Sequence, residues 1–166
     1  MRLIINGAGG RMGQTLLSLI ENNENYTLAA SCSMEFDTDR ENNIYKNIAE
    51  FDGEADCIID FSNHLATMDV TEYAVKRKIP LVVATTGQSA EELSMIKEAS
   101  KVIPLFYSQN MSLGVAVLSC LAKITAKAFP DADIEIIEKH HNQKLDVPSG
   151  TAILLADAIK SVKDDC

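Results

Sequence analysis

The stretch that decides the fold is Arg2–Gly13, RLIINGAGGRMG, in which a short apolar run leads directly into a cluster of glycines. The apolar spacing that follows predicts a helix over Met12–Asn22. Glycines between a strand and a helix permit a tight turn and a close approach of a ligand to the backbone. The N-terminus of the helix adds unpaired N–H groups, so this stretch predicts a site for the phosphates of a dinucleotide.

The spacing of these glycines departs from the usual GxGxxG pattern. Met12 stands where the third glycine would be, and Gly7, Gly10 and Gly13 fit the pattern GxxGxxG instead. A glycine turn without any ligand therefore remains an alternative at this point.

Strands and helices alternate along the chain as far as Tyr107. The expected strands are apolar on both faces, which indicates a parallel sheet covered by helices, a doubly wound Rossmann-like α/β fold. Ser89-Ala-Glu-Glu92 has the pattern of a capping box at the start of a helix. The polar segment Phe36–Asn47 is expected to be a surface loop. The predicted strands are Arg2–Asn6, Tyr26–Ser31, Cys57–Phe61, 80–85 and Val102–Tyr107, and the helices are Met12–Asn22, His64–Lys78 and Ser89–Ser100.

The character of the sequence changes after Asn110. A single predicted strand in this part cannot satisfy its edge groups, so the second domain is either incomplete or borrows a partner strand. We predict a dinucleotide-binding domain at 1–110 and a partial α+β domain for substrate binding, catalysis and oligomerisation at 111–166. The predicted elements of the second domain are a helix at Met111–Phe129, a strand at Asp133–Ile137, a polar loop at Lys139–Pro148 and a helix at Gly150–Val162.

Composition excludes several classes of protein. The 166 residues carry a net charge of −9, so the chain has no general attraction for nucleic acid or an anionic membrane. The apolar fraction of 46% is enough to build a core. There is no signal-peptide core and no apolar run as long as a membrane span. The four cysteines form no CxxC pair, which favours reduced thiols in a cytoplasmic protein, with Cys32 and Cys57 in the core.

Two short motifs follow predicted strands. Asp60-Phe-Ser62 ends the third strand and Ala84-Thr-Thr-Gly87 ends the fourth. Ligands of open α/β sheets bind at the carboxyl ends of strands, although each motif could also be a helix cap or a turn.

The most specific stretch is Glu138–Thr151, EKHHNQKLDVPSGT. Its histidine pair and Lys144 lie in an acidic chain, which indicates an anionic ligand. Ser149-Gly-Thr151 then opens a helix whose hydroxyls and N–H groups can bind an anion, or can be a plain N-cap. His140 and His141 could also be metal ligands, but no third ligand has a fitting spacing, so we expect no metal.

In their order along the chain, these motifs resemble those of the dihydrodipicolinate reductase family. The resemblance spans essentially the whole chain and rests on GAGGRMG, DFS, ATTG, QNMSLGV at residues 109–115, and the 138–151 stretch. It implies reduction of 4-hydroxy-tetrahydrodipicolinate, a cyclic dicarboxylate, to tetrahydrodipicolinate with NADPH or NADH, in diaminopimelate and lysine synthesis. Members of the family usually continue beyond this C-terminus with a portion that completes a sheet and joins subunits into a homotetramer.

The resemblance also implies roles for individual residues. His140 matches the proton donor and acceptor, and Lys144 matches the proton donor. The implied substrate contacts are His141, Ser149, Gly150 and Thr151. The implied cofactor contacts are Gly7, Ala8, Gly9, Gly10, Arg11, Met12, Ala84, Thr85, Thr86, Ser108, Gln109, Asn110 and Met111.

The residue after the second strand bears on the choice of cofactor. Dinucleotides usually meet an acidic residue there, but this chain has Ser33, which we also count among the predicted cofactor contacts, with Glu35 two residues later. Because Ser33 has no carboxylate, we predict that NADPH is used at least as well as NADH, with Arg11 as a candidate phosphate contact. Glu35 could take the acidic role, so the choice stays open.

Two alternatives to this function remain. One is another Rossmann oxidoreductase, such as a semialdehyde dehydrogenase, which would need a reactive cysteine. The other is a dinucleotide-binding or regulatory protein without turnover. For the glycine loop itself, we expect Gly7→Val to weaken cofactor binding without unfolding the sheet.

Overall fold

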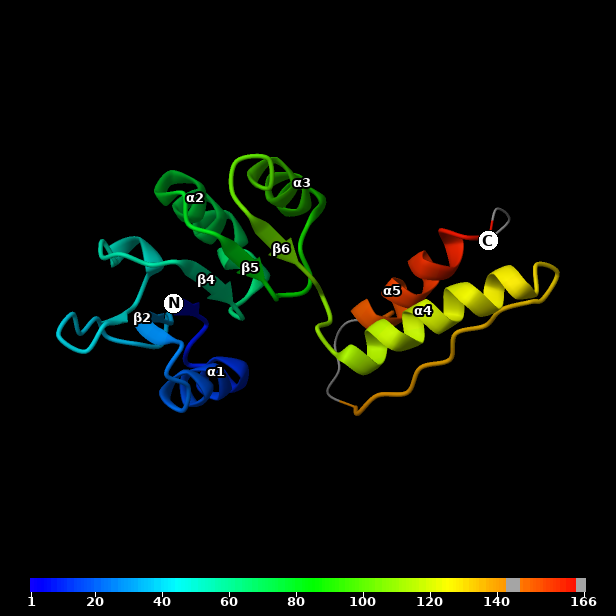
Figure 1. Ribbon diagram of the computed structural model, residues 1–166, viewed down its shortest axis with the longest axis horizontal. Helices are drawn as coiled ribbons and strands as arrows, with labels where there is room; N and C mark the ends of the chain where they lie inside the picture. The colour runs from blue at the N-terminus through cyan, green and yellow to red at the C-terminus, as the bar shows by residue number, and fades with distance from the viewer. Residues whose placement is uncertain (143–146, 164–166) are drawn as a thin grey trace. The chain divides into compact units, whose positions relative to one another are not determined.

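The computed structural model describes residues 1–142 and 147–163, in two compact units, Met1–Ser108 and Gln109–Cys166 (Figure 1). The strands are β1 (Arg2–Asn6), β2 (Thr27–Cys32), β3 (Ile44–Tyr45), β4 (Cys57–Asp60), β5 (Leu81–Val83) and β6 (Leu105–Tyr107). The α-helices are α1 (Arg11–Glu21), α2 (Thr67–Arg77), α3 (Ala90–Ala99), α4 (Leu113–Ala128) and α5 (Gly150–Lys160). Two short 3₁₀ helices are η1 (Ile48–Glu50) and η2 (His64–Ala66).

All six strands of the first unit form one parallel sheet in the order β3-β2-β1-β4-β5-β6. This order reverses between β1 and β4, which is the arrangement of a doubly wound Rossmann sheet. The predicted fold class is therefore confirmed for this unit. Helices α2 and α3 cover one face of the sheet and α1 lies on the other (Figure 1).

Each face of the sheet has its own core, because successive side chains of a strand point to opposite faces. Ile4 lies in the larger core, with residues of α2 and α3 such as Val70 and Ile96. Leu3 and Ile5 lie in the smaller core, where Ile20 of α1 packs. The strands are therefore buried on both sides, as their continuous apolar sequences predict.

The segment Phe36–Asn47, predicted to be a loop, contains the edge strand β3. β3 has only two residues, which is too short to give a periodic signal in the sequence. Tyr45 anchors it, because this side chain is buried and meets the ring of Phe51 edge-on at 5.5 Å between ring centroids.

The second unit, as far as it is described, contains α4 and α5, which pack against each other. The predicted strand Asp133–Ile137 is wrong: this segment is exposed and pairs with no strand of the described residues. An alternating apolar pattern shows which face a strand would bury, but it supplies no partner for the backbone.

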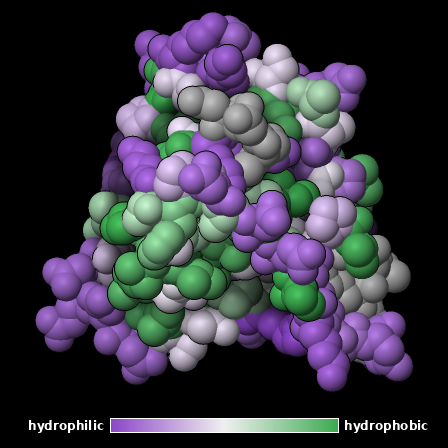
Figure 2. Space-filling model, turned by 90° about the vertical axis from the view of Figure 1, so that its right-hand side faces the viewer, coloured by the Kyte–Doolittle hydropathy of each residue, from purple (hydrophilic) through white to green (hydrophobic). Residues whose placement is uncertain are grey.

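Several apolar side chains of the second unit lie at its surface, and Figure 2 shows apolar side chains gathered on one face. Exposed apolar patches of this kind are typical of surfaces that contact other protein. The large apolar residues involved are Leu113, Val117, Leu118, Leu121, Ile124, Phe129 and Ile137.

The described cysteines are all free thiols. Cys32 is buried in the larger core and Cys57 packs against the smaller core, as predicted. Among the described residues, no helix has the length and apolar content needed to cross a membrane.

Candidate functional site

The glycine loop joins β1 to α1 by a turn that only glycine fits. Gly7 has φ of +82°, and a Cβ on it would lie 2.6 Å from backbone atoms of Phe61 and Ser62. A Cβ on Gly13 would lie 2.3 Å from the carbonyl oxygen of Gly7. Both ends of the GxxGxxG pattern are thus fixed by close backbone contacts. The expectation that Gly7→Val leaves the sheet intact does not fit this geometry, because a Cβ on Gly7 would collide with the backbone of Phe61 and Ser62, just after β4.

Part of the loop's backbone is already hydrogen-bonded within the protein. The N–H groups of Gly7 and Ala8 both donate to the carbonyl of Cys32 at 2.9 Å, and that of Gly10 donates to Gly7 at 3.0 Å. The first N–H groups of α1, from Arg11 and Met12, have no acceptor among the described residues. These helix-terminal groups are therefore among the donors that remain for a phosphate.

A cavity of about 630 Å³ opens beside this loop. It is lined by residues that follow β1, β2, β3 and β4 and by the start of α2, so it lies at the carboxyl ends of the strands. Gly7, Gly10 and Ser33 from the predicted cofactor contacts line it. Lys46 and Asn47 also line it, but the sequence did not point to them, because they follow strand β3, which was not predicted.

The two candidate residues for cofactor choice lie against the glycine loop. A Cβ on Gly9 would lie 2.8 Å from Ser33 Oγ and 3.1 Å from Glu35 Oε2. Glu35 therefore reaches the loop, and it lines the same cavity as Lys46. The lining of the cavity thus includes an acidic and a basic residue as well as Ser33.

A buried carboxylate lies at the end of β4, next to the reversal of strand order. Asp60 is fully buried, and its Oδ1 accepts hydrogen bonds from Asn6 Nδ2 at 2.9 Å and from Ser62 Oγ at 2.5 Å. Its Oδ2 has no hydrogen-bond partner among the described residues. Burial raises the pKa of Asp60 above its usual range, and the hydrogen bonds from Ser62 and Asn6 oppose that shift. Asp60 thereby ties the ends of β1 and β4 together below the cavity.

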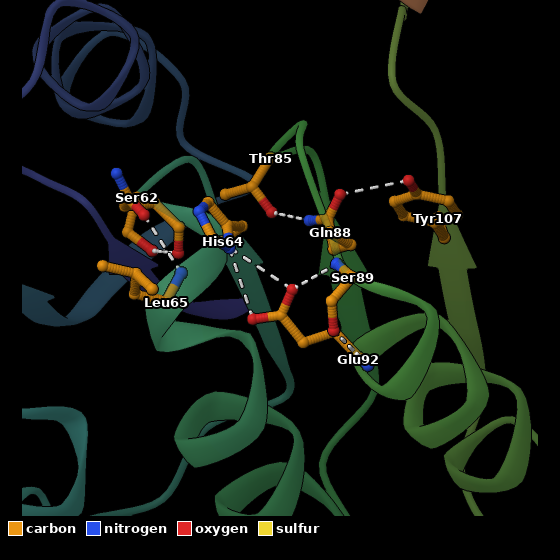
Figure 3. A network of polar contacts seen from close by, with 9 residues as sticks. Ser62, His64, Leu65, Thr85, Gln88, Ser89, Glu92 and Tyr107 are labelled. Carbon is orange, nitrogen blue, oxygen red and sulfur yellow. Dashed lines mark hydrogen bonds and ion pairs between the residues drawn. The ribbon is translucent and has the colours of Figure 1, made fainter.

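The loop between β5 and α3 carries the predicted contacts Ala84, Thr85 and Thr86 and is held by polar side chains (Figure 3). Thr85 is buried, and its Oγ1 accepts a hydrogen bond from Gln88 Nε2. The hydroxyl of Tyr107, at the end of β6, donates to Gln88 Oε1 at 3.1 Å. The predicted capping box is confirmed, since Ser89 and Glu92 exchange both hydrogen bonds at the start of α3.

In the second unit, Glu138 links two of the predicted site residues. Its Oε2 lies 2.8 Å from His140 Nε2, and its Oε1 accepts a hydrogen bond from the Ser149 N–H at 3.0 Å. These bonds, that of Ser149 first, lower the pKa of Glu138 to about 2, so the carboxylate stays charged at neutral pH. Ser149 is also the N-cap of α5, because its Oγ accepts from the Ala152 N–H at 3.1 Å.

The start of α5 lies against residues at the start of the second unit. Asn110 Nδ2 donates to Thr151 Oγ1 at 2.8 Å, and Gln109 Oε1 lies 3.0 Å from the place of a Cβ on Gly150. Two predicted cofactor contacts therefore lie next to two predicted substrate contacts. They are Gln109 and Asn110, and Gly150 and Thr151. Lys144 lies outside the described residues, and within those residues no group of three His, Cys, Asp or Glu side chains forms a metal site.

A parallel sheet in this order, with a glycine loop and an open helix N-terminus at its reversal point, defines a Rossmann-type nucleotide-binding domain. The sequence matches the family described as dihydrodipicolinate reductase, N-terminus, over residues 1–111, and the corresponding C-terminus family over residues 114–165. The chain therefore belongs to the dihydrodipicolinate reductase family, which confirms the resemblance found in the sequence.

Individual relatives agree with this assignment. The chain is 48% identical over 163 residues to the 4-hydroxy-tetrahydrodipicolinate reductase of Caldanaerobacter subterraneus subsp. tengcongensis, covering 98% of this chain and 64% of that protein. It is 41% identical to the reductase of the same name from Clostridium novyi, covering 99% and 66%. The dipicolinate-bound dihydrodipicolinate reductase of Paenisporosarcina sp. TG-14 superposes with a TM-score of 0.79 at 27% identity, over 100% of this chain and 68% of that one. The chain thus spans just under two thirds of the length of these two curated relatives.

Proposed function

We propose that this chain carries the cofactor-binding and catalytic residues of a reductase that converts 4-hydroxy-tetrahydrodipicolinate to tetrahydrodipicolinate with NADPH or NADH, in diaminopimelate and lysine synthesis. The proposal that the chain binds a dinucleotide cofactor rests on the open N-terminus of α1 beside a cavity of about 630 Å³. That site fits a dinucleotide, because the helix N-terminus suits a pyrophosphate and the cavity extends from it towards Ser33 and Lys46. The substrate part is supported by the named activity of the relatives and by the dipicolinate bound to one of them.

The second unit supplies the groups for the substrate. Reduced nicotinamide contributes the hydride when it is bound. The N–H groups of Gly150 and Thr151 at the start of α5 suit a carboxylate of the substrate. Glu138 holds His140 for proton exchange, and Lys144 stabilises developing negative charge and supplies a proton.

The two alternative functions are distinguished by thiol chemistry and by turnover. A semialdehyde dehydrogenase needs a reactive thiolate, whose pKa is lowered by its surroundings. Burial instead raises the pKa of Cys32 to about 12 and also raises that of Cys57. A binding protein without turnover would take up reduced cofactor and not oxidise it in the presence of 4-hydroxy-tetrahydrodipicolinate, whereas the proposed reductase would.

Gly10→Val tests where the cofactor binds. Gly10 lines the cavity in extended backbone, and the nearest atom to a Cβ there is Gly7 O at 3.4 Å, so the fold accepts a side chain. The isopropyl group would occupy space beside the free N–H groups of α1, and we expect the dissociation constant for NADH and NADPH to rise at least tenfold, or about 1.4 kcal/mol. Fluorescence titration measures the affinity, and circular dichroism checks the fold. Unchanged affinity in a folded variant would show that the cofactor does not bind at this loop.

The choice between cofactors depends on Glu35 and Lys46. We expect the unaltered chain to bind NADPH at least as well as NADH, because Ser33 has no carboxylate and Lys46 can pair with a 2′-phosphate. Lys46→Ala should weaken NADPH binding about tenfold and leave NADH nearly unchanged, while Glu35→Gln should favour NADPH by removing a repelling charge. Titrations of both cofactors against each variant measure this. A strong preference of the unaltered chain for NADH would contradict the inference from Ser33.

Three further features remain predictions. They are the division into a cofactor domain at 1–110 and a substrate domain at 111–166, the cytoplasmic location, and a homotetramer formed by a longer chain.

A further inference from the structure

His64 lies where the loop after β4 meets the loop before α3 (Figure 3). Its Nδ1 is 3.3 Å from Glu92 Oε2 and 3.4 Å from Glu92 Oε1. On the same ring, Cδ2 lies 3.7 Å from the place of a Cβ on Gly87. The imidazole therefore lies beside the glycine that ends the Ala84–Gly87 loop and is paired with the helix that follows this loop.

Glu92 pairs with His64 in addition to capping α3. The residue is only 7% exposed, and its Oε2 accepts a hydrogen bond from the Ser89 N–H at 2.6 Å. A carboxylate that is buried to this degree is usually paired, and His64 is the basic partner that it has among the described residues. The helix cap and the contact with His64 thus share one side chain.

The loop between β5 and α3 is consequently held from two sides. On the side of β6, Tyr107 holds Gln88, which in turn holds Thr85. On the side of β4, His64 pairs with Glu92 and lies beside Gly87, whose φ of +89° favours glycine. Removing His64 leaves the first attachment in place and releases the second.

We infer that His64 is a positioning residue: together with Glu92 it fixes the Ala84–Gly87 loop in the conformation that receives the nicotinamide half of the cofactor. This inference rests on the proposed function. A dinucleotide spans the point where the strand order reverses, between β1 and β4. The part of the cavity near Ser33 and Lys46 lies at the ends of β2 and β3 and suits the adenosine half. The cavity continues past Gly10 to the residues after β4, so the nicotinamide half is expected towards the ends of β4 and β5.

The test compares two ligands that differ in the nicotinamide. NADH contains both halves of the cofactor, whereas ADP-ribose keeps the adenosine, the pyrophosphate and the second ribose but lacks the nicotinamide ring. We expect His64→Ala to raise the dissociation constant for NADH about five- to tenfold, the size of one ordinary lost hydrogen bond. The dissociation constant for ADP-ribose and the thermal unfolding midpoint should stay nearly unchanged.

Three further variants separate positioning from general stability. His64→Gln keeps a donor for Glu92 and should restore most of the NADH affinity. Glu92→Gln keeps the capping box, since glutamine also serves at this position, but should give the same selective loss of NADH affinity. Glu98→Gln is the matched control, because this exposed glutamate of α3 pairs with Lys101 instead of His64.

The outcomes are distinct. Loss of affinity for NADH alone supports the inference. Equal loss for NADH and ADP-ribose, or a lower unfolding midpoint, would make His64 a general stabiliser of the fold and overturn it, as would unchanged NADH affinity. An unaltered chain that binds neither ligand would instead refute the proposed function, on which the inference depends.

Discussion

Gly7→Ala is expected to lower the free energy of unfolding of the first unit by about 3–5 kcal/mol, from overpacking and from a left-handed backbone conformation. A Cβ on Gly7 would lie 2.6 Å from three backbone atoms of Phe61 and Ser62, and none of these atoms can rotate away. The φ of +82° adds strain for any residue with a side chain. Because domains are stable by only about 5–15 kcal/mol, a large part of the stability would be lost.

Urea unfolding measures this loss, with Gly10→Ala as the control. Gly10 has φ of −76° and ψ of 166°, an ordinary extended conformation, and the nearest atom to a Cβ there is 3.4 Å away. The control should change the unfolding free energy by less than about 1 kcal/mol, because this geometry strains neither the backbone nor the packing. Equal stability of the two variants would mean that the close contact between the glycine loop and β4 does not exist.

The sequence predicted those parts of the fold that depend on local signals. Apolar runs located most of the parallel strands, and the capping box at Ser89 located the start of α3. Strand β3 was not predicted, because a strand of two residues is too short to show an alternating apolar pattern. The strand expected at Asp133–Ile137 is absent because an alternating pattern needs a partner, and the described residues offer none.

The site was predictable only where its chemistry is concentrated in one motif. The sequence pointed to the glycine loop, but not to the use of the Gly7 and Ala8 N–H groups by Cys32, which moves the expected phosphate donors to Arg11 and Met12. His64 and Glu92 are 28 residues apart, so no spacing rule connects them. Such pairs depend on which loops the sheet order brings together, which is a property of the tertiary structure.

Lys144→Ala is expected to lower turnover by about two to three orders of magnitude, the usual effect of removing one group that stabilises transition-state charge. In the proposed reaction, reduction of the dicarboxylate develops negative charge that must be protonated. The chain carries a net charge of −9, so this charge needs a local cation. His140 is engaged by Glu138, and of the two lysines in the same stretch, Lys139 and Lys144, only Lys144 matches the family motif. The test requires a form of the protein that turns over substrate.

The control is Lys139→Ala, which removes an exposed lysine from the same stretch without touching a predicted contact. Steady-state rates then separate the roles of Lys144, because lost transition-state stabilisation lowers kcat and kcat/KM together, whereas lost carboxylate binding alone raises KM. The dissociation constant for NADPH should stay the same, since Lys144 is remote in sequence from the glycine loop that carries the predicted phosphate site. Near-normal kcat with a raised KM would reduce Lys144 to a binding residue. Near-normal values of both would exclude it from the mechanism and leave His140, held by Glu138, as the proton-transferring group to be tested next.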